Sequence, residues 1–518
     1  MDDKKQPPLA PGAEIKTLEH HHAPVPGVKE GGEGKVTDAP RQLSWRALFT
    51  RQDNTAFFAE ALDKYGYDGA ISPEQEKRLV RKIDCLVLPC LAMCYAFYYI
   101  DKTTLSYAAI FGLKKPQSEG GLGLEGTDYS WLSSSFYFGW LAWAIPTNLI
   151  MQRSPTSTYL ASQIFLWGVF LMIQASCKNF TELLVLRVLG GAVESIADPA
   201  FMLITCTFYT RAEQPSRISA WYAANGVGVA GGGLLGYCIG QIKSSLPSWK
   251  YEFLIIGALC ALWGIVLLLV LPSNPATCMW FTREERLMAV ARLRGNQTGI
   301  ENKKFKWDQA REAFTDRNTW LFFLLGFIAN IPNGGISNFS TLIFQGLGFD
   351  TLKTSLLGIP QGALVCIWIG LGAFLNGRLP ANSRTIVCML FMIPTIAGSL
   401  GFLLAPKDAY VGRLICFYLT GSWLGACVGN IAGPFFYKSN QAPSYRLGIG
   451  SMLVANCLEV AILLLLRLSF IARNKLRDRQ LENVVGADGS KSEAVPHENE
   501  TTFSDLTDGQ NPNFRYVY

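Results

Sequence analysis

Apolar residues gather in long runs along the middle of the chain, with short polar stretches between them. An α-helix that crosses a membrane needs about 20 mostly apolar residues, since it rises about 1.5 Å per residue across a hydrocarbon layer about 30 Å thick. Six such runs precede one long polar stretch and five follow it. They cover residues 83–112, 129–151, 158–177, 181–209, 216–241, 252–272, 319–344, 354–376, 384–405, 410–437 and 446–471. The pattern predicts an all-α, polytopic membrane protein with eleven spans.

The polar segments divide the chain into five parts. Residues 1–72 and 473–518 are rich in charged residues, Gly, Pro and Ser, which predicts disordered tails. Between the tails we expect a six-helix half at 73–272, a central loop at 273–318 and a second half at 319–472. Two sets of spans joined by a charged loop are typical of two-halved transporters.

Basic residues predict how the chain is oriented in the membrane. Lys and Arg cluster at 77–82 before the first span, within the loop at 273–318 and at 473–479 after the last span. Because short cytoplasmic flanks carry the excess of Lys and Arg, both tails and the central loop are predicted to be cytoplasmic. The first helix is predicted to begin after Ser72, with Gln75 completing a capping box.

The number of spans conflicts with this orientation. Two cytoplasmic ends require an even number of crossings, and eleven are counted. The run at 410–437 should start and finish outside, yet its 28 residues reach about 42 Å, enough for one crossing and not two. The second half therefore lacks about one helix.

Composition narrows the classes of protein and of chemistry. Only 17% of the 518 residues are charged, against about 25% in soluble domains, and the net charge of +6 comes largely from clusters beside apolar runs. Nucleic-acid binding is therefore not expected. The cysteines lie mostly inside apolar runs without metal-ligand spacing, and the four histidines lie in the tails. We expect no metal, no cofactor and no enzymatic activity, and proton chemistry in the membrane must use carboxylates.

Local motifs carry a family resemblance. They include "SWLSSSFYFGWLAWAIPTNLIMQR" from Ser130, "RVLGGAVES" from Arg187, "FTREERLMAVARLRG" from Phe281 and "NIPNGGISNF" from Asn330. Together they resemble the fungal allantoate permease branch of the anion:cation symporter family, within the major facilitator superfamily. The resemblance implies a fold of two six-helix halves that imports a small organic anion with a proton across the plasma membrane by alternating access. Allantoate, ureidosuccinate, nicotinate or a similar carboxylate would be the substrate, and we expect a monomer.

Charged residues inside the spans are the main candidates for function, because a charge in the bilayer core costs at least about 2.5–3.5 kcal/mol. Arg187 and Glu194 lie seven residues apart, on one helix face. The planar guanidinium of Arg187 suits a substrate carboxylate, and Glu194 suits proton transfer. The alternative is a structural ion pair that only locks helices together.

Three more charges accompany this pair. Asp101 and Lys102 are predicted in the outer part of the first span. Lys102 would attract the anion, and Asp101 would be its partner and a candidate for proton coupling. The alternative is that the two form an interfacial ion pair. Asp198 lies one turn after Glu194, beside Pro199. Because two neighbouring acids repel when both are ionised, Asp198 suits a proton carrier, and a hydrogen bond at a kink is the alternative.

Polar and aromatic residues in the spans are predicted to form the substrate wall. They are Tyr137, Trp140, Asn225, Asn330, Asn333 and Gln361. The asparagines around Pro332 suggest a broken seventh span, and the fifth span offers a glycine-rich packing face. Glu459 in the last span has no assigned role.

Three places depart from the family pattern. Ala144 stands where the family commonly has an acid, and Asn376 and Gly377 stand where a gate motif has one. The stretch 418–434 joins parts of two family spans with the intervening residues absent, at the same place as the conflict in span number. The alternative function is therefore a transport-incompetent truncated homologue or a nutrient-sensing membrane protein.

Overall fold

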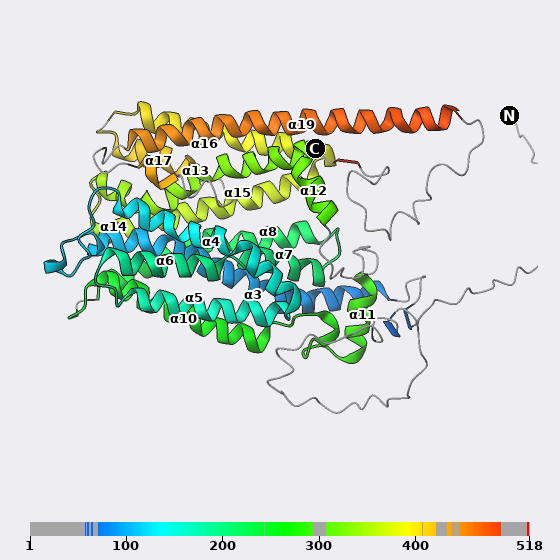
Figure 1. Cartoon of the computed structure of the whole chain (residues 1–518), viewed down its shortest axis with the longest axis horizontal. Coiled ribbons are helices and arrows are strands. Elements are labelled where there is room, and N and C mark those ends of the chain that lie inside the picture. Colours follow the sequence, from blue (N-terminus) through cyan, green and yellow to red (C-terminus); the bar gives the residue numbers. More distant parts are fainter. Residues whose placement is uncertain are drawn as a thin grey trace, which may run out of the picture. The chain divides into compact units, whose positions relative to one another are not determined.

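Long helices lie side by side in the computed structural model of this chain (Figure 1). It describes residues 71–242, 244–293, 307–406, 408–420, 433–437 and 445–487, together with residues 57, 60, 61, 64, 65, 441, 515 and 516. These residues all belong to one unit, Trp45–Tyr518. The described residues form helices and no strands, as the apolar pattern predicts.

The first half of the bundle follows the predicted runs. It contains α3 (Pro73–Ala108), α4 (Asp128–Arg153), α5 (Thr156–Gln174), α6 (Phe180–Glu194), α7 (Ala197–Phe208), α8 (Gln214–Tyr222), α9 (Ala224–Gly240) and α10 (Ser248–Val270). The predicted runs 181–209 and 216–241 are each divided into two consecutive helices, α6 with α7 and α8 with α9. The capping box at the start of α3 is confirmed, with reciprocal hydrogen bonds between Ser72 and Gln75.

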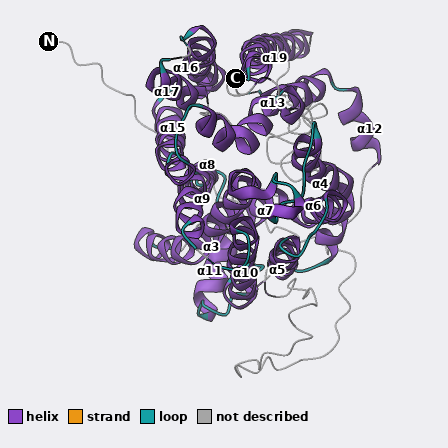
Figure 2. Ribbon diagram, turned by 90° about the vertical axis from the view of Figure 1, so that its left-hand side faces the viewer, coloured by secondary structure: helices purple, strands orange, loops and turns teal. Residues whose placement is uncertain are grey.

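The second half is reached through two shorter helices, α11 (Arg283–Leu293) and α12 (Trp307–Thr315). It contains α13 (Arg317–Gly346), α14 (Thr351–Leu356), α15 (Gly358–Arg378), α16 (Arg384–Leu404), α17 (Tyr410–Thr420) and α19 (Arg446–Ala487). In the end-on view the helices of this half lie above those of the first half (Figure 2). Seven helical stretches of the described chain are long and apolar enough to cross a membrane.

Two predicted features differ from the structure. The seventh span is not broken, because α13 continues through Pro332. Proline removes a single N–H donor, the one that would bond to the carbonyl of Ile328, so the other hydrogen bonds of the helix can still form. The amides of Asn330 and Asn338 each donate to a carbonyl four residues earlier, on Gly326 and Gly334. The last helix continues to Ala487, so the predicted tail begins as helix. The predicted shortage of a helix at 418–434 falls mostly on residues 421–432, which lie outside the described part, and stays a prediction.

Polar and apolar residues are arranged for a lipid surround. Large apolar side chains such as Ile145, Leu262 and Ile367 are exposed on the helices, whereas several charged side chains are buried among them. This distribution is the reverse of that in a soluble protein, where charges face water. Glycines allow close helix contact, and a Cβ on Gly139 of α4 or on Gly191 of α6 would collide with a carbonyl of the other helix.

The two ends of the bundle differ. Residues 109–127 join α3 to α4 at the end where α14 also lies, called here the loop end, and α11 lies at the other end (Figure 1). Near the loop end the halves are joined by hydrogen bonds, between the hydroxyls of Ser106 and Thr341 at 2.6 Å and from the hydroxyl of Tyr129 to the carbonyl of Asn338 at 2.6 Å. The halves are therefore in direct contact at the loop end.

At the opposite end, ion pairs hold α11 against the first half. The guanidinium of Arg292 contacts Glu213 at 2.6 Å and Glu76 at 3.3 Å. Burial raises the pKa of Glu213, but hydrogen bonds from the Thr210 N–H and from Arg292 outweigh that effect, so the pKa stays below its ordinary value. Part of the predicted central loop is thus an ordered helix docked on the first half.

Candidate functional site

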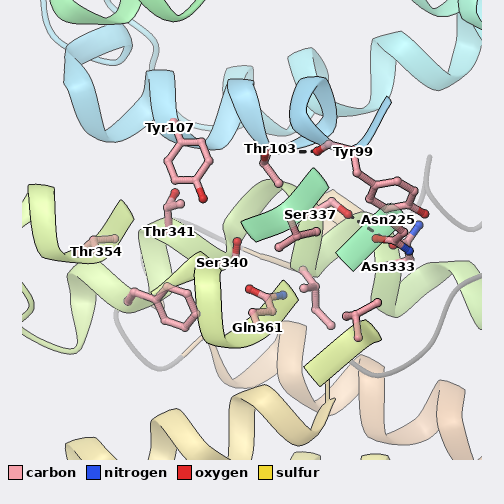
Figure 3. Close-up of a pocket in the computed structure, with 15 residues that line it drawn as sticks. Tyr99, Thr103, Tyr107, Asn225, Asn333, Ser337, Ser340, Thr341, Thr354 and Gln361 are labelled. Atoms are coloured by element: carbon pink, nitrogen blue, oxygen red, sulfur yellow. Dashed lines mark hydrogen bonds between the residues drawn. The ribbon is translucent and has the colours of Figure 1, made fainter. Parts of the chain in front are cut away.

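A polar cavity lies between the two halves (Figure 3). It encloses about 620 Å³, including the open space at its mouth. Side chains from α3, α9, α13, α14 and α15 surround it. Its polar and aromatic lining residues are Tyr99, Thr103, Tyr107, Asn225, Asn333, Ser337, Ser340, Thr341, Phe344, Thr354 and Gln361. A cavity between two halves with a few convergent polar groups is the usual form of a small-molecule site.

Neutral hydrogen-bonding groups dominate the wall of this cavity. Asn333 accepts a hydrogen bond from the hydroxyl of Ser337 at 3.3 Å, and Gln361 faces the cavity from α15. The side-chain nitrogen of Asn225 on α9 is buried without a hydrogen-bond partner in the described chain. Because a buried donor without an acceptor costs about 1–3 kcal/mol, Asn225 is suited to donate to a bound molecule.

The five predicted charges are gathered beside this cavity, within the first half. Asp101 and Lys102 come from α3, Arg187 and Glu194 from α6, and Asp198 from α7. The first four have exposed fractions of only 2–8%. Asp101 has Lys102 and Arg187 as electrostatic neighbours, and Glu194 has all four of the other charges. We call these five residues the charge cluster.

Arg187 and Glu194 do not form the ion pair that was the alternative interpretation. No ion pair in the described chain includes Arg187, and its Nε has no hydrogen-bond partner. Its guanidinium lies over the ring of Phe136, 5.0 Å from the centroid. Both carboxylate oxygens of Glu194 are likewise without a hydrogen-bond partner in the described chain. The geometry therefore leaves hydrogen-bonding capacity on both side chains for a ligand.

Asp101 and Lys102 are buried inside the first half rather than placed at an interface with water. Asp101 accepts a hydrogen bond from the indole N–H of Trp167 at 3.1 Å. The ammonium of Lys102 lies 3.9 Å from the ring centroid of Tyr98 and 4.8 Å from that of Tyr99. Cation–π contacts of this kind stabilise a buried cation.

Tyr99 connects the charge cluster to the cavity. Its ring makes a cation–π contact with the Lys102 ammonium and also lines the cavity wall. Lys102 of the cluster is therefore next to the larger cavity, with the ring of Tyr99 in contact with both. Glu194, Trp167 and Tyr98 line a second, smaller space of about 270 Å³.

Some predicted wall residues lie elsewhere. Asn225, Asn333 and Gln361 line the cavity, whereas Tyr137, Trp140 and Asn330 are not among its lining residues. The ring of Tyr137 is buried against Phe136 at 5.3 Å between centroids. Because the amide of Asn330 donates to a carbonyl of its own helix, it satisfies the backbone rather than a ligand.

The prediction missed several polar groups of the wall. On α13, the hydroxyls of Ser337, Ser340 and Thr341 and the ring of Phe344 line the cavity together with the predicted Asn333. Their spacing of three and four residues marks one helix face, so helical periodicity was a signal that could have found them. The cavity residues Thr103 and Tyr107 on α3 were also missed, and their spacing of four residues is the same kind of signal.

Apolar helices around buried charges and a polar cavity between two halves define a membrane transporter. The chain belongs to the major facilitator superfamily, whose family model matches residues 91–465. An uncharacterized transporter of Schizosaccharomyces pombe is 36% identical over 89% of this chain and 93% of that protein. The allantoate permease of Saccharomyces cerevisiae is 32% identical over 86% of this chain and 87% of that protein. The resemblance to the allantoate permease branch is thus confirmed, and the chain is a transporter and not an enzyme.

Proposed function

We propose that this transporter is a proton-coupled symporter that imports a small organic anion across the plasma membrane by alternating access. The similarity to allantoate permease supports a carboxylate substrate such as allantoate, ureidosuccinate or nicotinate. Both tails and the central loop would be cytoplasmic, in keeping with the basic flanks, and the loop end would face outside. The halves at 73–272 and 319–472 would rock against each other in a monomer.

The proposal rests on the guanidinium of Arg187, which forms no ion pair within the described residues and whose Nε has no hydrogen-bond partner there. A buried cation without an ionic partner in the described chain is costly, and a substrate carboxylate would supply two charge-assisted hydrogen bonds. Lys102 would add a second positive charge beside Tyr99, at the cavity wall. Asn225, Asn333 and Gln361 would hold the polar remainder of the substrate.

Glu194, Asp198 and Asp101 are the carboxylates proposed to carry the coupled proton. A carboxylate close to Arg187 and Lys102 competes with the substrate anion for the same positive charges. Protonation of Glu194 would remove one negative charge and leave Arg187 available to the substrate. Entry of the anion and of the proton would then assist each other, which is the condition for symport.

Uptake in a yeast strain that lacks its own carboxylate permeases tests the function. Labelled allantoate, ureidosuccinate and nicotinate are offered one at a time, at acidic and at neutral external pH, with and without a protonophore. We expect accumulation of at least one acid that increases at acidic pH and is lost with the protonophore. Accumulation that ignores both would contradict proton coupling. Surface-expressed protein that transports none of a wide panel of acids would favour the sensing alternative.

A further inference from the structure

A buried glutamate outside the charge cluster has no role in the function proposed so far. Glu252 lies in the second turn of α10, and its exposed fraction is 0%. Neither of its carboxylate oxygens has a hydrogen-bond partner in the described chain. One turn earlier, the indole of Trp249 donates to the carbonyl of Gly120 in the segment at the loop end. Glu252 is therefore buried just inside that end of the bundle.

Tyr107 and Gly236 are the neighbours that define the surroundings of Glu252. A Cβ placed on Gly236 of α9 would lie 3.2 Å from Oε1 of Glu252 and 3.2 Å from the ring of Tyr107. The elements that pack against α10 include α3, α5, α9 and the turn at Ala109–Leu113. Among their described residues, Tyr107 is the titratable group that meets Glu252, and no charged side chain does.

These surroundings favour the neutral, protonated form of the Glu252 carboxyl group. An ionised carboxylate that is buried without a cation or a hydrogen-bond donor costs several kcal/mol, whereas the neutral acid costs far less. A purely structural role does not explain an acid here, because an apolar side chain of similar size would pack without that cost. An acidic group at this place is better explained by a state of the protein in which it meets water.

Tyr107 separates Glu252 from the cavity and also takes part in the contact between the halves. Its ring lies beside Gly236, and its hydroxyl lies 2.7 Å from the position of a Cβ on Gly358 in the second half. The hydroxyl also borders the cavity, at the side where Thr341 lies (Figure 3). Separation of α9 from α14 and α15 at the loop end would remove this contact and open the space beside Glu252 to water.

We propose that Glu252 is a proton-binding site gated by Tyr107 and by the contact of the two halves at the loop end. When the halves separate, the carboxylate accepts a proton from hydronium, which becomes a water molecule. When the halves close, the neutral acid is buried. Separation of the halves at this end would then be linked to the proton concentration on that side. The proposal rests on the proton-coupled function above and adds a carboxylate to the charge cluster.

Infrared difference spectroscopy of the purified full chain tests proton binding without any substrate. Protonated carboxylic acids absorb at a carbonyl frequency distinct from that of carboxylates, and the band shifts in heavy water. We expect Glu252→Gln to lose one component of this band between alkaline and acidic pH. The matched control is Glu459→Gln, which removes a buried glutamate in the second half and should leave that component in place. A Glu252→Gln spectrum identical to wild type would overturn the proposal.

Transport in proteoliposomes then tests the gating role, with labelled allantoate, ureidosuccinate and nicotinate as probes. Glu252→Gln should reduce accumulation driven by a proton gradient at least tenfold and keep counterflow exchange of the same acid. Glu252→Asp retains an acid and should keep part of the accumulation. Equal loss of accumulation and exchange in both variants would mark Glu252 as structural and overturn the proposal, as would wild-type accumulation in Glu252→Gln.

The two measurements separate failure of this inference from failure of the proposed function. If wild-type protein shows no proton-driven uptake of any probe, the symport proposal fails. The infrared component assigned to Glu252 would still decide whether the residue binds a proton.

Discussion

The two halves contribute different chemistry to the site. The first half contributes the charge cluster, whose three carboxylates and two cations are those of Asp101, Lys102, Arg187, Glu194 and Asp198. The second half lines the cavity with amides and hydroxyls, from Asn333 to Gln361, and none of its described lining residues is charged. Charge is strong and long-ranged in a medium of low dielectric constant, whereas neutral hydrogen bonds act only at contact. In the proposed function, the first half would therefore provide the driving force and the coupling, and the second half would recognise the shape and polarity of the substrate.

Removal of the Arg187 guanidinium from the first half should have the largest effect on carboxylate uptake. Arg187→Ala is expected to reduce carboxylate uptake by roughly 100-fold, because bonds to a charged group contribute about 1.5–3 kcal/mol each. Arg187→Lys keeps the charge without the planar fork and should retain part of the uptake. Initial rates of labelled uptake, normalised to surface protein, measure the effect. Unchanged uptake in Arg187→Ala would remove this residue from the substrate site.

Loss of the proposed proton carrier in the first half should abolish coupling and leave substrate binding in place. Glu194→Gln is expected to bind substrate and exchange it, yet to lose accumulation and the dependence of uptake on external pH. The amide has nearly the shape of the acid and cannot titrate. A pH profile of uptake, compared with counterflow exchange, measures both properties. A wild-type pH profile in the variant would exclude Glu194 as the proton carrier.

Changes in the wall of the second half should alter affinity and leave coupling intact. Asn333→Ala is expected to raise KM by about 3–10-fold, the effect of losing one neutral hydrogen bond of about 0.5–1.5 kcal/mol. Its pH profile should match wild type. Asn330→Ala is the matched control, because that amide bonds to Gly326 of its own helix and not to the cavity. Equal KM changes in the two variants would show that helix structure, rather than substrate contact, is responsible.

The smallest effect is expected at the ion pairs outside the membrane. Arg292→Ala should lower the apparent melting temperature by roughly 2–4 °C, since Glu213 and Glu76 lose their partner at a partly exposed site. The pKa of Glu213 lies below its ordinary value in the folded chain, so its stabilisation is present above the unfolded pKa and is lost as pH falls through the folded pKa. The difference between variant and wild type should therefore shrink in acid. A difference that grows in acid would contradict this pairing.

Much of the fold was predictable because membrane insertion imposes a simple pattern. Runs of apolar residues marked the helices, and Ser72 with Gln75 marked the start of α3. The divisions between α6 and α7 and between α8 and α9 were not predicted, since a change of helix direction does not alter hydropathy. Pro332 suggested a break that α13 does not contain, because a proline removes only one backbone donor from the helix.

The candidate site was predictable in its charges and less so in its neutral groups. Charges inside apolar runs are rare and costly, so Arg187, Glu194 and Asp101 were conspicuous. Asn330 and Asn333 are the same residue type, so composition could not distinguish their roles. Only Asn333 lines the cavity, whereas the amide of Asn330 bonds to the backbone of its own helix. Glu252 was hidden because it stands at the edge of an apolar run, where an acid usually meets water.

The sequence by itself determined the class of protein, the family, most helix positions and the charged residues that the proposed function uses. Each of these depends on composition and on local spacing, which the chain carries without reference to its fold. Only the tertiary structure decided that Arg187 and Glu194 do not pair with each other, that Tyr99 joins the charge cluster to the cavity, and that Tyr107 stands between Glu252 and the cavity. The physical reason is that lipid and protein interior are equally apolar, so hydrophobicity does not specify which helix faces meet.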